Sequence, residues 1–338
     1  MKTIIIAIPA FNEEENIEEC LKSVMNFHIP NNIIHEIWVW DGGSTDNTIN
    51  IVQSIERRSK FVRLMKNPYK TQSHAMNLTI KQAKADWIMR LDAHSIYPKN
   101  YLIDIYETAI KTDAGNVGGI WEIQKRSNRL LDLLAFCLIT HPFGVGNSHF
   151  RSGVKSGPVD TVPFGFYNTK IFKMVGYFDE RLIRAQDYEF NQRLIRHGFK
   201  IWLNPRIKIK YFPKNNVIQL LKKYFLLEAP YNAYMWYLAP YTFSLRHSIT
   251  SCFTLGVIFG TVLSFFSTLI LKLYLAVLIL YAGLNIGSSI QLARLHKKIM
   301  LVILMPITFF LFHFGHGSGV LWGLILVAIR RSPIQKLL

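Results

Sequence analysis

The carboxyl-terminal third of the chain contains three apolar stretches that hold no Asp, Glu, Lys or Arg. Two of them, residues 252–271 and 273–292, are 20 residues long, and the third, residues 299–329, is 31 residues long. About 20 apolar residues suffice for a helix to cross the hydrocarbon core of a bilayer. The sequence therefore predicts a transmembrane helical region over residues 249–330, with two spans followed by a third span or a helical hairpin at 299–329.

Basic residues flank these stretches unevenly. Arg246 precedes the first stretch and residues 294–298 hold three basic side chains, whereas only Lys272 separates the first two stretches. Because basic loops stay on the cytosolic side, we expect a multi-pass protein of the cell (inner) membrane whose preceding domain is cytosolic. His313 and the glycine-rich residues 315–319 interrupt the third stretch, which allows a turn there. The basic residues at 330–336 favour the hairpin, which would return the chain to that side.

The formal net charge of +17 allows nucleic acid, a membrane surface or an anionic substrate as partner. No zinc-finger spacing or long basic block is present, so we expect no nucleic acid. Residues 216–248 mix Leu, Tyr and Trp with Lys and Arg, which is typical of amphipathic helices at a membrane interface. The three separate cysteines, without a CxxC pair, exclude a disulfide scaffold and a cysteine zinc site.

Residues 1–215 alternate short β-branched runs with helical patterns. A series of strands alternating with helices indicates an α/β domain with a mostly parallel, doubly wound sheet. Ligands bind such folds at the carboxyl ends of the strands. The expected strands are residues 3–8, 34–40, 61–66, 87–91, 116–125 and 159–165.

Acidic residues lie in the loops where several of these strands end. Asp41 follows the second strand and could bind a nucleobase or ribose, or simply form the turn before Gly42. Asp92 and His94 follow the fourth strand and could bind one cation, with Mn²⁺ or Mg²⁺ suited to oxygen and imidazole, or Asp92 could cap a helix. Asp187 opens the helix expected at 187–197, where it could act as a general base or as a cap.

Four motifs occur in the order that resembles family 2 glycosyltransferases of the GT-A fold. They are Pro-Ala-Phe-Asn-Glu-Glu at 9–14, Asp-Gly-Gly-Ser-Thr-Asp-Asn-Thr at 41–48, Asp-Ala-His at 92–94 and Gln-Asp-Tyr-Glu at 186–189. Further stretches are similar to the subgroup typified by the succinoglycan-biosynthesis glucosyltransferase. They are residues 141–146, 185–187, 244–247 and 313–319.

The resemblance implies a role for eight residues. Pro9, Ala10 and Phe11 would line the nucleobase pocket, Glu13 would contact the ribose, Asp41 would bind the base, Asp92 and His94 would hold the diphosphate and its divalent cation, and Asp187 would be the catalytic base. His94 stands where the family has a second Asp, and Gln186 where an acidic residue is common. The Gln-x-x-Arg-Trp motif of processive synthases is absent, which favours single transfer.

The expected function is an inverting hexosyltransferase that moves a sugar from a nucleotide-diphosphate sugar, with UDP-hexose as donor, to a polyprenyl-diphosphate-linked saccharide for surface polysaccharide synthesis. The alternatives are a polyprenyl-monophosphate glycosyltransferase and an inactive membrane scaffold with the same fold. Four histidines, His141, His149, His313 and His316, could suggest a metal set or a lipid-diphosphate contact. We expect packing or headgroup contact instead of a metal set, because the last two lie in a membrane segment and the first two do not, and a contact of His313 and His316 with a lipid diphosphate stays open.

Overall fold

The computed structural model describes residues 1–125, 127, 129–146, 155–213 and 216–333. The chain divides into two compact units, and both are built from separate stretches of sequence. The first combines Met1–Gln124 with His149–Phe212, and the second combines Lys125–Ser148 with Pro213–Leu338.

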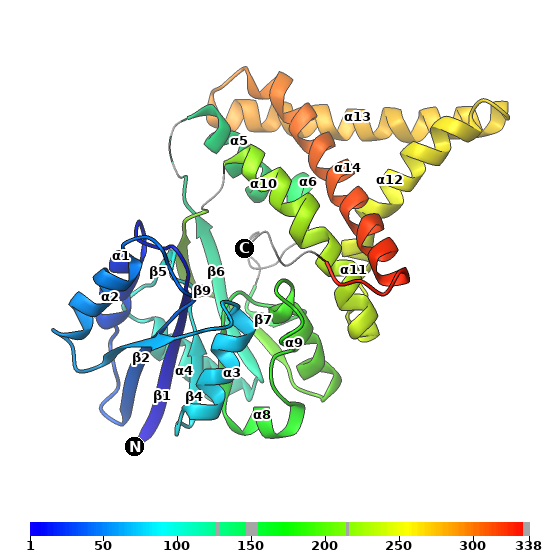
Figure 1. Ribbon diagram of the computed structural model, residues 1–338. Helices are drawn as coiled ribbons and strands as arrows, with labels where there is room; N and C mark the ends of the chain where they lie inside the picture. Colours follow the sequence, from blue (N-terminus) through cyan, green and yellow to red (C-terminus); the bar gives the residue numbers. More distant parts are fainter. Residues whose placement is uncertain (126, 128, 147–154, 214–215, 334–338) are drawn as a thin grey trace. The chain divides into compact units, whose positions relative to one another are not determined.

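The first unit is organised around a five-stranded sheet (Figure 1). Its order is β3-β2-β1-β4-β8, with β1 (Lys2–Ala10), β2 (Ile33–Asp41), β3 (Val62–Lys66), β4 (Trp87–Arg90) and β8 (Gly165–Asn168). The first four strands are parallel, and β8 runs antiparallel to β4. The core of β1 is buried on both faces, as its unbroken apolar sequence predicts.

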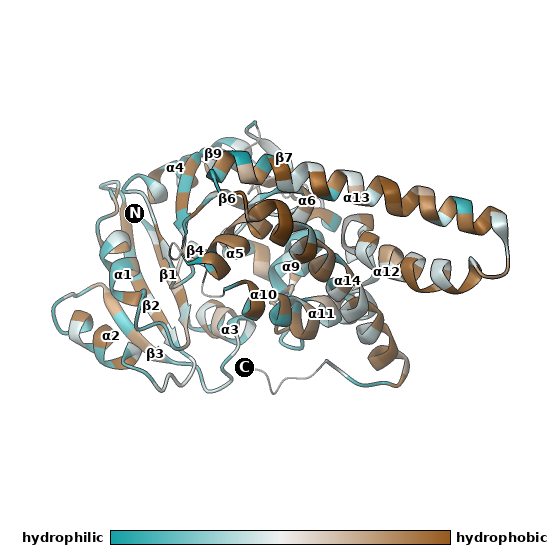
Figure 2. Cartoon of the chain, turned by 90° about the horizontal axis from the view of Figure 1, so that it is seen from above, coloured by the Kyte–Doolittle hydropathy of each residue, from teal (hydrophilic) through white to brown (hydrophobic). Residues whose placement is uncertain are grey.

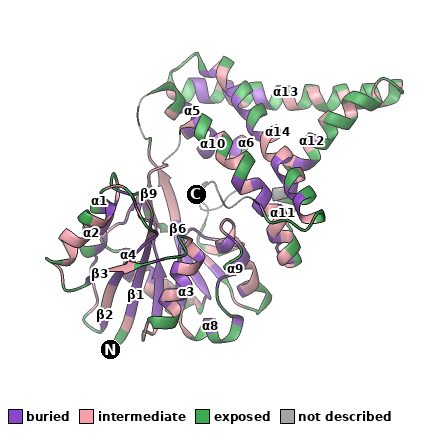
Figure 3. Ribbon diagram, viewed as in Figure 1, coloured by how far each residue is buried: buried purple, intermediate pink, exposed green. Residues whose placement is uncertain are grey.

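Helices cover both faces of this sheet. Ile4, Ile6 and Ile8 of β1 face a cluster that contains side chains of α1 (Ile17–Met25), α2 (Thr48–Glu56) and α4 (Tyr101–Thr112). Ile5 and Ala7 face the opposite cluster, with α3 (Gln72–Gln82), α8 (Lys170–Val175) and α9 (Gln186–Arg196). Figure 3 shows the buried strands between these helices. The predicted doubly wound α/β architecture is confirmed.

A second, four-stranded sheet lies in the same unit and differs from the sequence-based expectation. It contains β5 (Ser95–Ile96), β6 (Asn116–Ile123), β7 (Gly157–Val159) and β9 (Ile201–Tyr211). The strand expected at 159–165 is wrong, because pairing stops between β7 and β8. Pro163 lacks an N–H donor and Phe164 has a left-handed φ of 65°, and both break a strand.

The second unit is helical, and α14 (Leu301–Ala328) packs against most of its other elements. These are α5 (Leu130–Thr140), α6 (Pro142–Val145), α10 (Val217–Lys223), η1 (Tyr224–Glu228), α11 (Ala229–Leu238), α12 (Leu245–Leu263) and α13 (Thr268–His296), with η2 (Pro240–Thr242) beside α11. α6 ends at Val145, and residues 147–154 lie outside the described residues.

Two helices, α13 and α14, are long and apolar enough to cross a membrane. Figure 2 shows the dense hydrophobic colouring of α13. In the most apolar 18-residue stretch of α13, only 6% is buried within the protein. The corresponding share for α14 is 44%. The span expected at 252–271 is wrong as a single helix, since α12 ends at Leu263, and α13 includes Lys272.

The hairpin favoured for residues 299–329 is not formed, because α14 runs unbroken through its glycines. A Cβ on Gly319 would lie 2.4 Å from the carbonyl oxygen of Phe225, and one on Gly323 would lie 2.7 Å from Cα of Pro230. These glycines therefore let neighbouring helices approach α14 closely. The glycine-rich pattern indicated a turn only because sequence does not distinguish a turn from a close helix contact.

Candidate active site

The carboxyl ends of three parallel strands bring the predicted residues to one edge of the large sheet. Ala10 and Asp41 are partners in the β1–β2 register, and the backbone N–H of Gly42 donates to the carbonyl oxygen of Ala10 at 2.9 Å. Asp92 follows β4, which pairs with the other side of β1. This edge is where an α/β sheet of this kind binds its ligands.

Asp41 is buried, and its carboxylate organises the turn that follows β2. Its Oδ2 accepts hydrogen bonds from the backbone N–H groups of Gly43 at 2.8 Å and Ser44 at 3.2 Å. The turn-forming interpretation of Asp41 is therefore correct. Its role toward a nucleobase stays a prediction, because a carboxylate has acceptor sites beyond these two bonds.

Hydrogen bonds join the loop after β1 to the loop after β2. The backbone N–H of Asn12 donates to Ser44 Oγ at 3.0 Å, and that of Thr45 donates to Asn12 Oδ1 at 2.9 Å. The N–H of Glu13 donates to Thr48 Oγ1 at 2.8 Å. Asn12 adopts a left-handed φ of 51°, a conformation that asparagine tolerates better than most residues. The two loops form one rim beside Pro9, Ala10 and Phe11.

His94 lies between an acidic and a phenolic side chain. Its Nδ1 is 3.1 Å from Glu13 Oε1, and its Nε2 is 3.3 Å from the hydroxyl of Tyr211. Glu13 is buried, and its carboxylate contacts the His94 ring. Its expected contact with a ribose stays a prediction. Among the described residues, no group of three or more His, Cys, Asp or Glu side chains could hold a metal ion alone.

Tyr97 fixes the backbone at Asp92. Its hydroxyl accepts from the N–H of Asp92 at 2.8 Å and donates to the carbonyl oxygen of Asp92 at 3.1 Å. Burial raises the pKa of the Tyr97 phenol well above its ordinary value, so the hydroxyl keeps its proton and can make both bonds. The main chain of Asp92 is thus held in one conformation before any ligand binds.

Asp187 occupies the first turn of α9, as predicted, and its side chain is 28% exposed. The residue before the helix, Ala185, has a left-handed φ of 62° at the N-cap position, where no side-chain cap bond forms. Non-glycine residues in this conformation often mark functional segments. Asp187 is therefore placed on a rigid element, with its side chain partly exposed.

Sequence reasoning missed Arg90, which connects two of the predicted residues. Its Nη1 lies 2.6 Å from Asp187 Oδ2, and its Nη2 lies 2.6 Å from Asp92 Oδ1. Burial lowers the pKa of the Arg90 guanidinium, but the carboxylates of Asp187 and Asp92 raise it by more, so the group stays charged. The signal was a single basic residue in an otherwise apolar predicted strand.

Gln72 was also missed, and it forms a second connection. Its Nε2 donates to Asp92 Oδ1 at 3.1 Å, and its Oε1 accepts from Nε2 of Gln186. The first turn of α3 therefore touches both the Asp-Ala-His segment and the residue before Asp187. The spacing of these residues along the chain contains no sign of this contact.

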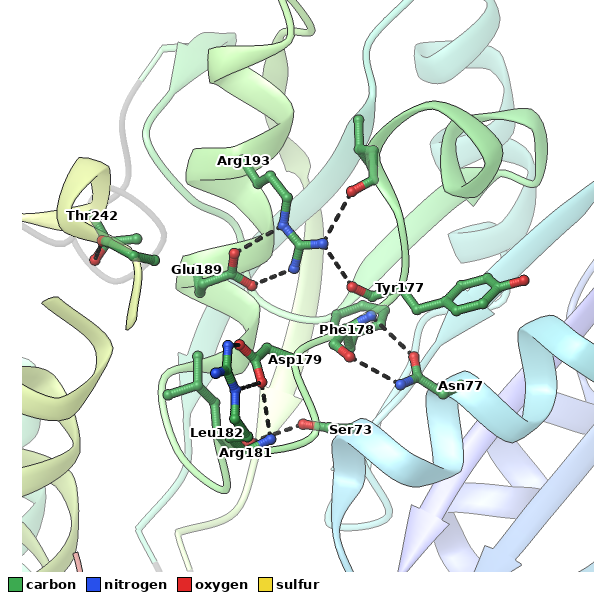
Figure 4. A network of polar contacts seen from close by, with 12 residues as sticks. Ser73, Asn77, Tyr177, Phe178, Asp179, Arg181, Leu182, Glu189, Arg193 and Thr242 are labelled. Carbon is green, nitrogen blue, oxygen red and sulfur yellow. Dashed lines mark hydrogen bonds and ion pairs between the residues drawn. The ribbon is translucent and has the colours of Figure 1, made fainter. Parts of the chain in front are cut away.

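A polar network holds the segment that precedes α9 (Figure 4). The side-chain amide of Asn77 donates to the carbonyl oxygen of Phe178 at 2.9 Å and accepts from its N–H at 3.0 Å. Ser73 Oγ donates to the carbonyl oxygen of Leu182 at 2.9 Å. Because Ser73 and Asn77 both lie on α3, this helix fixes the loop that leads to Asp187.

Three of the four histidines singled out in the sequence lie among the described residues, and each has a protein partner. His313 Nε2 donates to the carbonyl oxygen of Phe143 at 2.8 Å, so its Nδ1 accepts from the hydroxyl of Tyr281 at 3.0 Å. His316 Nδ1 lies 2.8 Å from Thr250 Oγ1, and His141 Nδ1 accepts from the N–H of Phe143. His149 lies outside the described residues.

Comparison with known proteins identifies the family of the chain. The sequence profile described as Glycosyl transferase family 2 matches residues 5–174. The Methanococcus voltae dolichyl N-acetyl-alpha-D-glucosaminyl phosphate 3-beta-D-2,3-diacetamido-2,3-dideoxy-beta-D-glucuronosyltransferase is 30% identical over 343 residues, which cover 96% of this chain and 98% of that protein. The Rhizobium meliloti succinoglycan biosynthesis protein ExoA is 28% identical over 223 residues, covering 65% of this chain and 66% of its own.

Among solved structures, the mannosyltransferase PcManGT from Pyrobaculum calidifontis, in complex with GDP-Man and Mn²⁺, has a TM-score of 0.59 at 16% identity. The similarity covers 94% of this chain and 87% of that one, and it shows the fold. The predicted resemblance and the GT-A fold are both confirmed. The chain belongs to glycosyl transferase family 2 and is a glycosyltransferase.

Proposed function

We propose that this glycosyltransferase moves a sugar from a nucleotide-diphosphate sugar, with UDP-hexose as the expected donor, to a polyprenyl-diphosphate-linked saccharide. The observation that carries the proposal is the pair of ion contacts that join Asp92 to Asp187 through Arg90. Asp92 is the residue proposed on the donor side and Asp187 the one proposed on the acceptor side. A sugar bound between them would have its leaving group and its attacking hydroxyl on opposite sides.

The donor nucleotide is assigned to the rim formed by the loops after β1 and β2. Pro9, Ala10 and Phe11 would line the nucleobase pocket, with Asp41 accepting from the base. Glu13 would contact the ribose, or reach it through His94, with which it is paired. These contacts bind and orient the donor.

Asp187 would take the proton from the acceptor hydroxyl as that oxygen forms its bond to the anomeric carbon. The bond from the anomeric carbon to the diphosphate oxygen breaks in the same displacement, which inverts the configuration. The nucleoside diphosphate leaves with the bonding electron pair. Asp187 suits this role because its side chain is partly exposed, and because its helix α9 is joined to α3 by the hydrogen bond from Gln186 to Gln72.

Asp92 and His94 fit a divalent cation that is shared with the donor. Mg²⁺ and Mn²⁺ often use one or two protein ligands and complete their shell with substrate phosphates and water. A Mn²⁺ ion accompanies GDP-Man in the PcManGT complex, which supports a cation here. Such a cation, when bound, would offset the charge that develops on the leaving diphosphate. Asp92 would be its principal ligand, since both His94 ring nitrogens already contact protein groups.

The acceptor is proposed from the relatives and from the helices of the second unit. The name of the Methanococcus voltae relative specifies a dolichyl-phosphate-linked sugar as acceptor, which supports a saccharide on a lipid carrier. The apolar helices α13 and α14 would keep the enzyme at the membrane where such a carrier resides. The alternative of transfer directly to polyprenyl monophosphate predicts activity with a bare lipid phosphate.

The proposed location is the cell membrane, crossed more than once, with the catalytic domain on the cytosolic side. Arg294 lies in the last turn of α13, and Lys297 and Lys298 follow that helix before α14 begins. These basic residues favour the cytosolic face. An unbroken α14 that crosses fully would carry Arg330 and Arg331 to the other face. The cytosolic placement of those two residues, which depended on a hairpin, is therefore not part of the proposal.

The test combines donor and acceptor panels with one base variant. Purified enzyme would receive UDP- and GDP-sugars with Mn²⁺ and one of three acceptors: a polyprenyl-diphosphate saccharide, a polyprenyl-phosphate saccharide or a bare polyprenyl phosphate. We expect transfer to a lipid-linked saccharide and a fall in kcat of about 10³-fold in Asp187→Asn, the usual range for a lost general base. Calorimetry should show that Asp187→Asn binds the donor with the same affinity as the wild type.

The matched control is Asp113→Asn, an exposed residue at the end of α4 whose left-handed φ of 50° suits asparagine. It should retain full activity. Transfer that is unaffected by Asp187→Asn would overturn the base assignment. Donor binding without turnover on any acceptor would instead favour the inactive scaffold.

A further inference from the structure

Arg90 is a buried cation that none of the proposed steps uses. Its side chain is 4% exposed, and its strand neighbours Trp87, Ile88 and Met89 are all buried and apolar. A charged group in such surroundings is tolerated only when it is paired and hydrogen-bonded. The position therefore needs a reason beyond the formation of β4, since an apolar residue would pack there at lower cost.

The reason is the interaction of Arg90 with the two carboxylates of the site. Each terminal nitrogen of the guanidinium faces a different carboxylate, Asp92 Oδ1 and Asp187 Oδ2, and both separations are 2.6 Å. Bonds of this length between ionised groups are among the strongest hydrogen bonds in proteins. The centroid of the Phe164 ring lies 6.0 Å from the guanidinium carbon. Arg90 therefore contacts one carboxylate two positions along the chain and another 97 positions along it.

The connection through Gln72 runs between the same two segments. Asp92 Oδ1 accepts from Gln72 as well as from Arg90, and Gln72 in turn accepts from Gln186, the neighbour of Asp187. One connection is ionic and the other is made by neutral amides. Both join the Asp-Ala-His turn to the first turn of α9. The distance between these two segments is therefore fixed by two separate connections.

We propose that Arg90 is a positioning residue whose forked guanidinium holds the Asp187 carboxylate at a fixed distance and orientation from Asp92. This inference rests on the proposed function, which assigns the acceptor proton to Asp187 and the donor diphosphate to Asp92. With both carboxylates held by one planar group, the donor site and the proton acceptor are aligned before the substrates arrive. Misplacement of a reacting group by about 1 Å can cost on the order of 10²-fold in rate.

A purely structural role of Arg90 predicts a different response to substitution. If Arg90 only neutralised two partly buried carboxylates, any cation of similar length would serve. Lysine keeps the charge, but its ammonium is a single point that lacks the planar fork. Arg90→Lys therefore separates charge from geometry, and Arg90→Gln removes the charge while keeping hydrogen-bonding capacity.

The experiment measures kcat, KM and donor affinity for Arg90→Lys in wild-type and Asp187→Asn backgrounds. We expect kcat to fall about 30- to 100-fold in Arg90→Lys, while the donor dissociation constant from calorimetry with Mn²⁺ changes less than about threefold. In the Asp187→Asn background, the same change should cost less than about threefold more, because residues that act as a unit have non-additive effects. Arg90→Gln should show the same pattern with a larger fall.

The control variant is Arg181→Lys, which alters an exposed arginine paired with Asp179 in the loop before α9. It should change kcat by less than about twofold. If the Arg90 variants do not fold, Gln72→Leu tests the same alignment without a buried charge. Its kcat should fall about fivefold in the wild-type background and hardly at all with Asp187→Asn.

Three outcomes would overturn the inference. Full kcat in Arg90→Lys would show that charge alone suffices. Losses in kcat that multiply with those of Asp187→Asn, or a parallel loss of donor affinity and melting temperature, would show a structural role only. By contrast, unchanged transfer in Asp187→Asn alone would overturn the proposed function itself, and this inference with it.

Discussion

The guanidinium of Arg90 donates to Asp187 Oδ2 across 2.6 Å and thereby connects the end of β4 to the start of α9. The same group reaches Asp92, so one buried side chain links the two carboxylates to which the chemistry is assigned. A family 2 glycosyltransferase must bring donor and acceptor together from different loops. In this chain, part of that task falls to a strand residue that neither substrate is expected to touch.

Asp41→Asn should weaken donor binding more than catalysis. The substitution removes the charge that accepts from Gly43 and Ser44 and that is proposed to accept from the nucleobase. Hydrogen bonds to a charged group contribute about 1.5–3 kcal/mol, so the donor dissociation constant should rise about tenfold or more. Calorimetric titration with donor and Mn²⁺ measures this, and kcat at saturating donor should change little. An unaltered donor affinity would remove Asp41 from the binding site.

Asn77→Ala should destabilise the first unit by about 2–4 kcal/mol. The change leaves both backbone groups of Phe178 without their side-chain partner in a buried position, and each such group costs about 1–3 kcal/mol. The readout is the free energy of unfolding, from denaturant titration followed by circular dichroism. Asn50→Ala is the control, because Asn50 is exposed and its side-chain amide donates to exposed Asn47 on the surface. Equal stability of the two variants would contradict the prediction.

Two glycines of α14 should respond to alanine in opposite directions. Nothing lies within 4 Å of a Cβ built on Gly315, so Gly315→Ala should stabilise the helix by about 0.5–1 kcal/mol. A Cβ on Gly319 would meet the carbonyl oxygen of Phe225 at 2.4 Å, so Gly319→Ala should lower the melting temperature of the detergent-solubilised protein. A lower melting temperature for Gly315→Ala, or a higher one for Gly319→Ala, would argue against the α14 packing described above.

The cysteines provide a test of burial and of membrane topology. Burial raises the pKa of the Cys20 thiol strongly and that of Cys137 to about 12, so neither should react with maleimide in the folded protein. Cys252 is exposed. In a Cys252→Ser background, Lys298→Cys should react with a membrane-impermeant maleimide only after cells are permeabilised. Phe266→Cys, at the opposite end of α13, should react in intact cells.

Labelling of both introduced cysteines from the same side would contradict the proposed crossing by α13. Labelling of Cys20 or Cys137 without denaturant would contradict their burial. Loss of reactivity at both introduced positions in every condition would place the α12–α13 connection and residues 297–300 inside the protein instead.

Much of the first unit was predictable because its strands are continuous apolar runs. β1 to β4 follow from such runs, and α9 from its amphipathic pattern. β9 was not predicted because Pro205 and alternating lysines obscure it, and the alternation itself places Ile207 and Ile209 inward. The acidic loops could be found from their position after strands. Arg90 and Gln72 could not be assigned, because their roles depend on contacts between distant segments.

The second unit was harder to predict for a physical reason. Composition shows that a helix is apolar, but it does not show which face touches protein. The break at residues 264–267 contains no charge or proline, whereas Lys272 lies inside α13, so the charge pattern put the boundary in the wrong place. The glycines of α14 suggest a turn in the sequence because the helices that they contact, η1 and α11, lie far away along the chain.

The bond between His313 and Phe143, 170 residues apart, has a consequence for how the protein is made. On the ribosome, α5 and α6 emerge long before α14, against which they pack. Until then, α5 can pack against α6 and α10 but not against α14, so part of the apolar surface of α5 and α6 must be sheltered by lipid or a chaperone. Completion of the second unit is therefore a late event in biosynthesis, and a nascent chain arrested before residue 301 should be a preferred target for quality-control proteolysis.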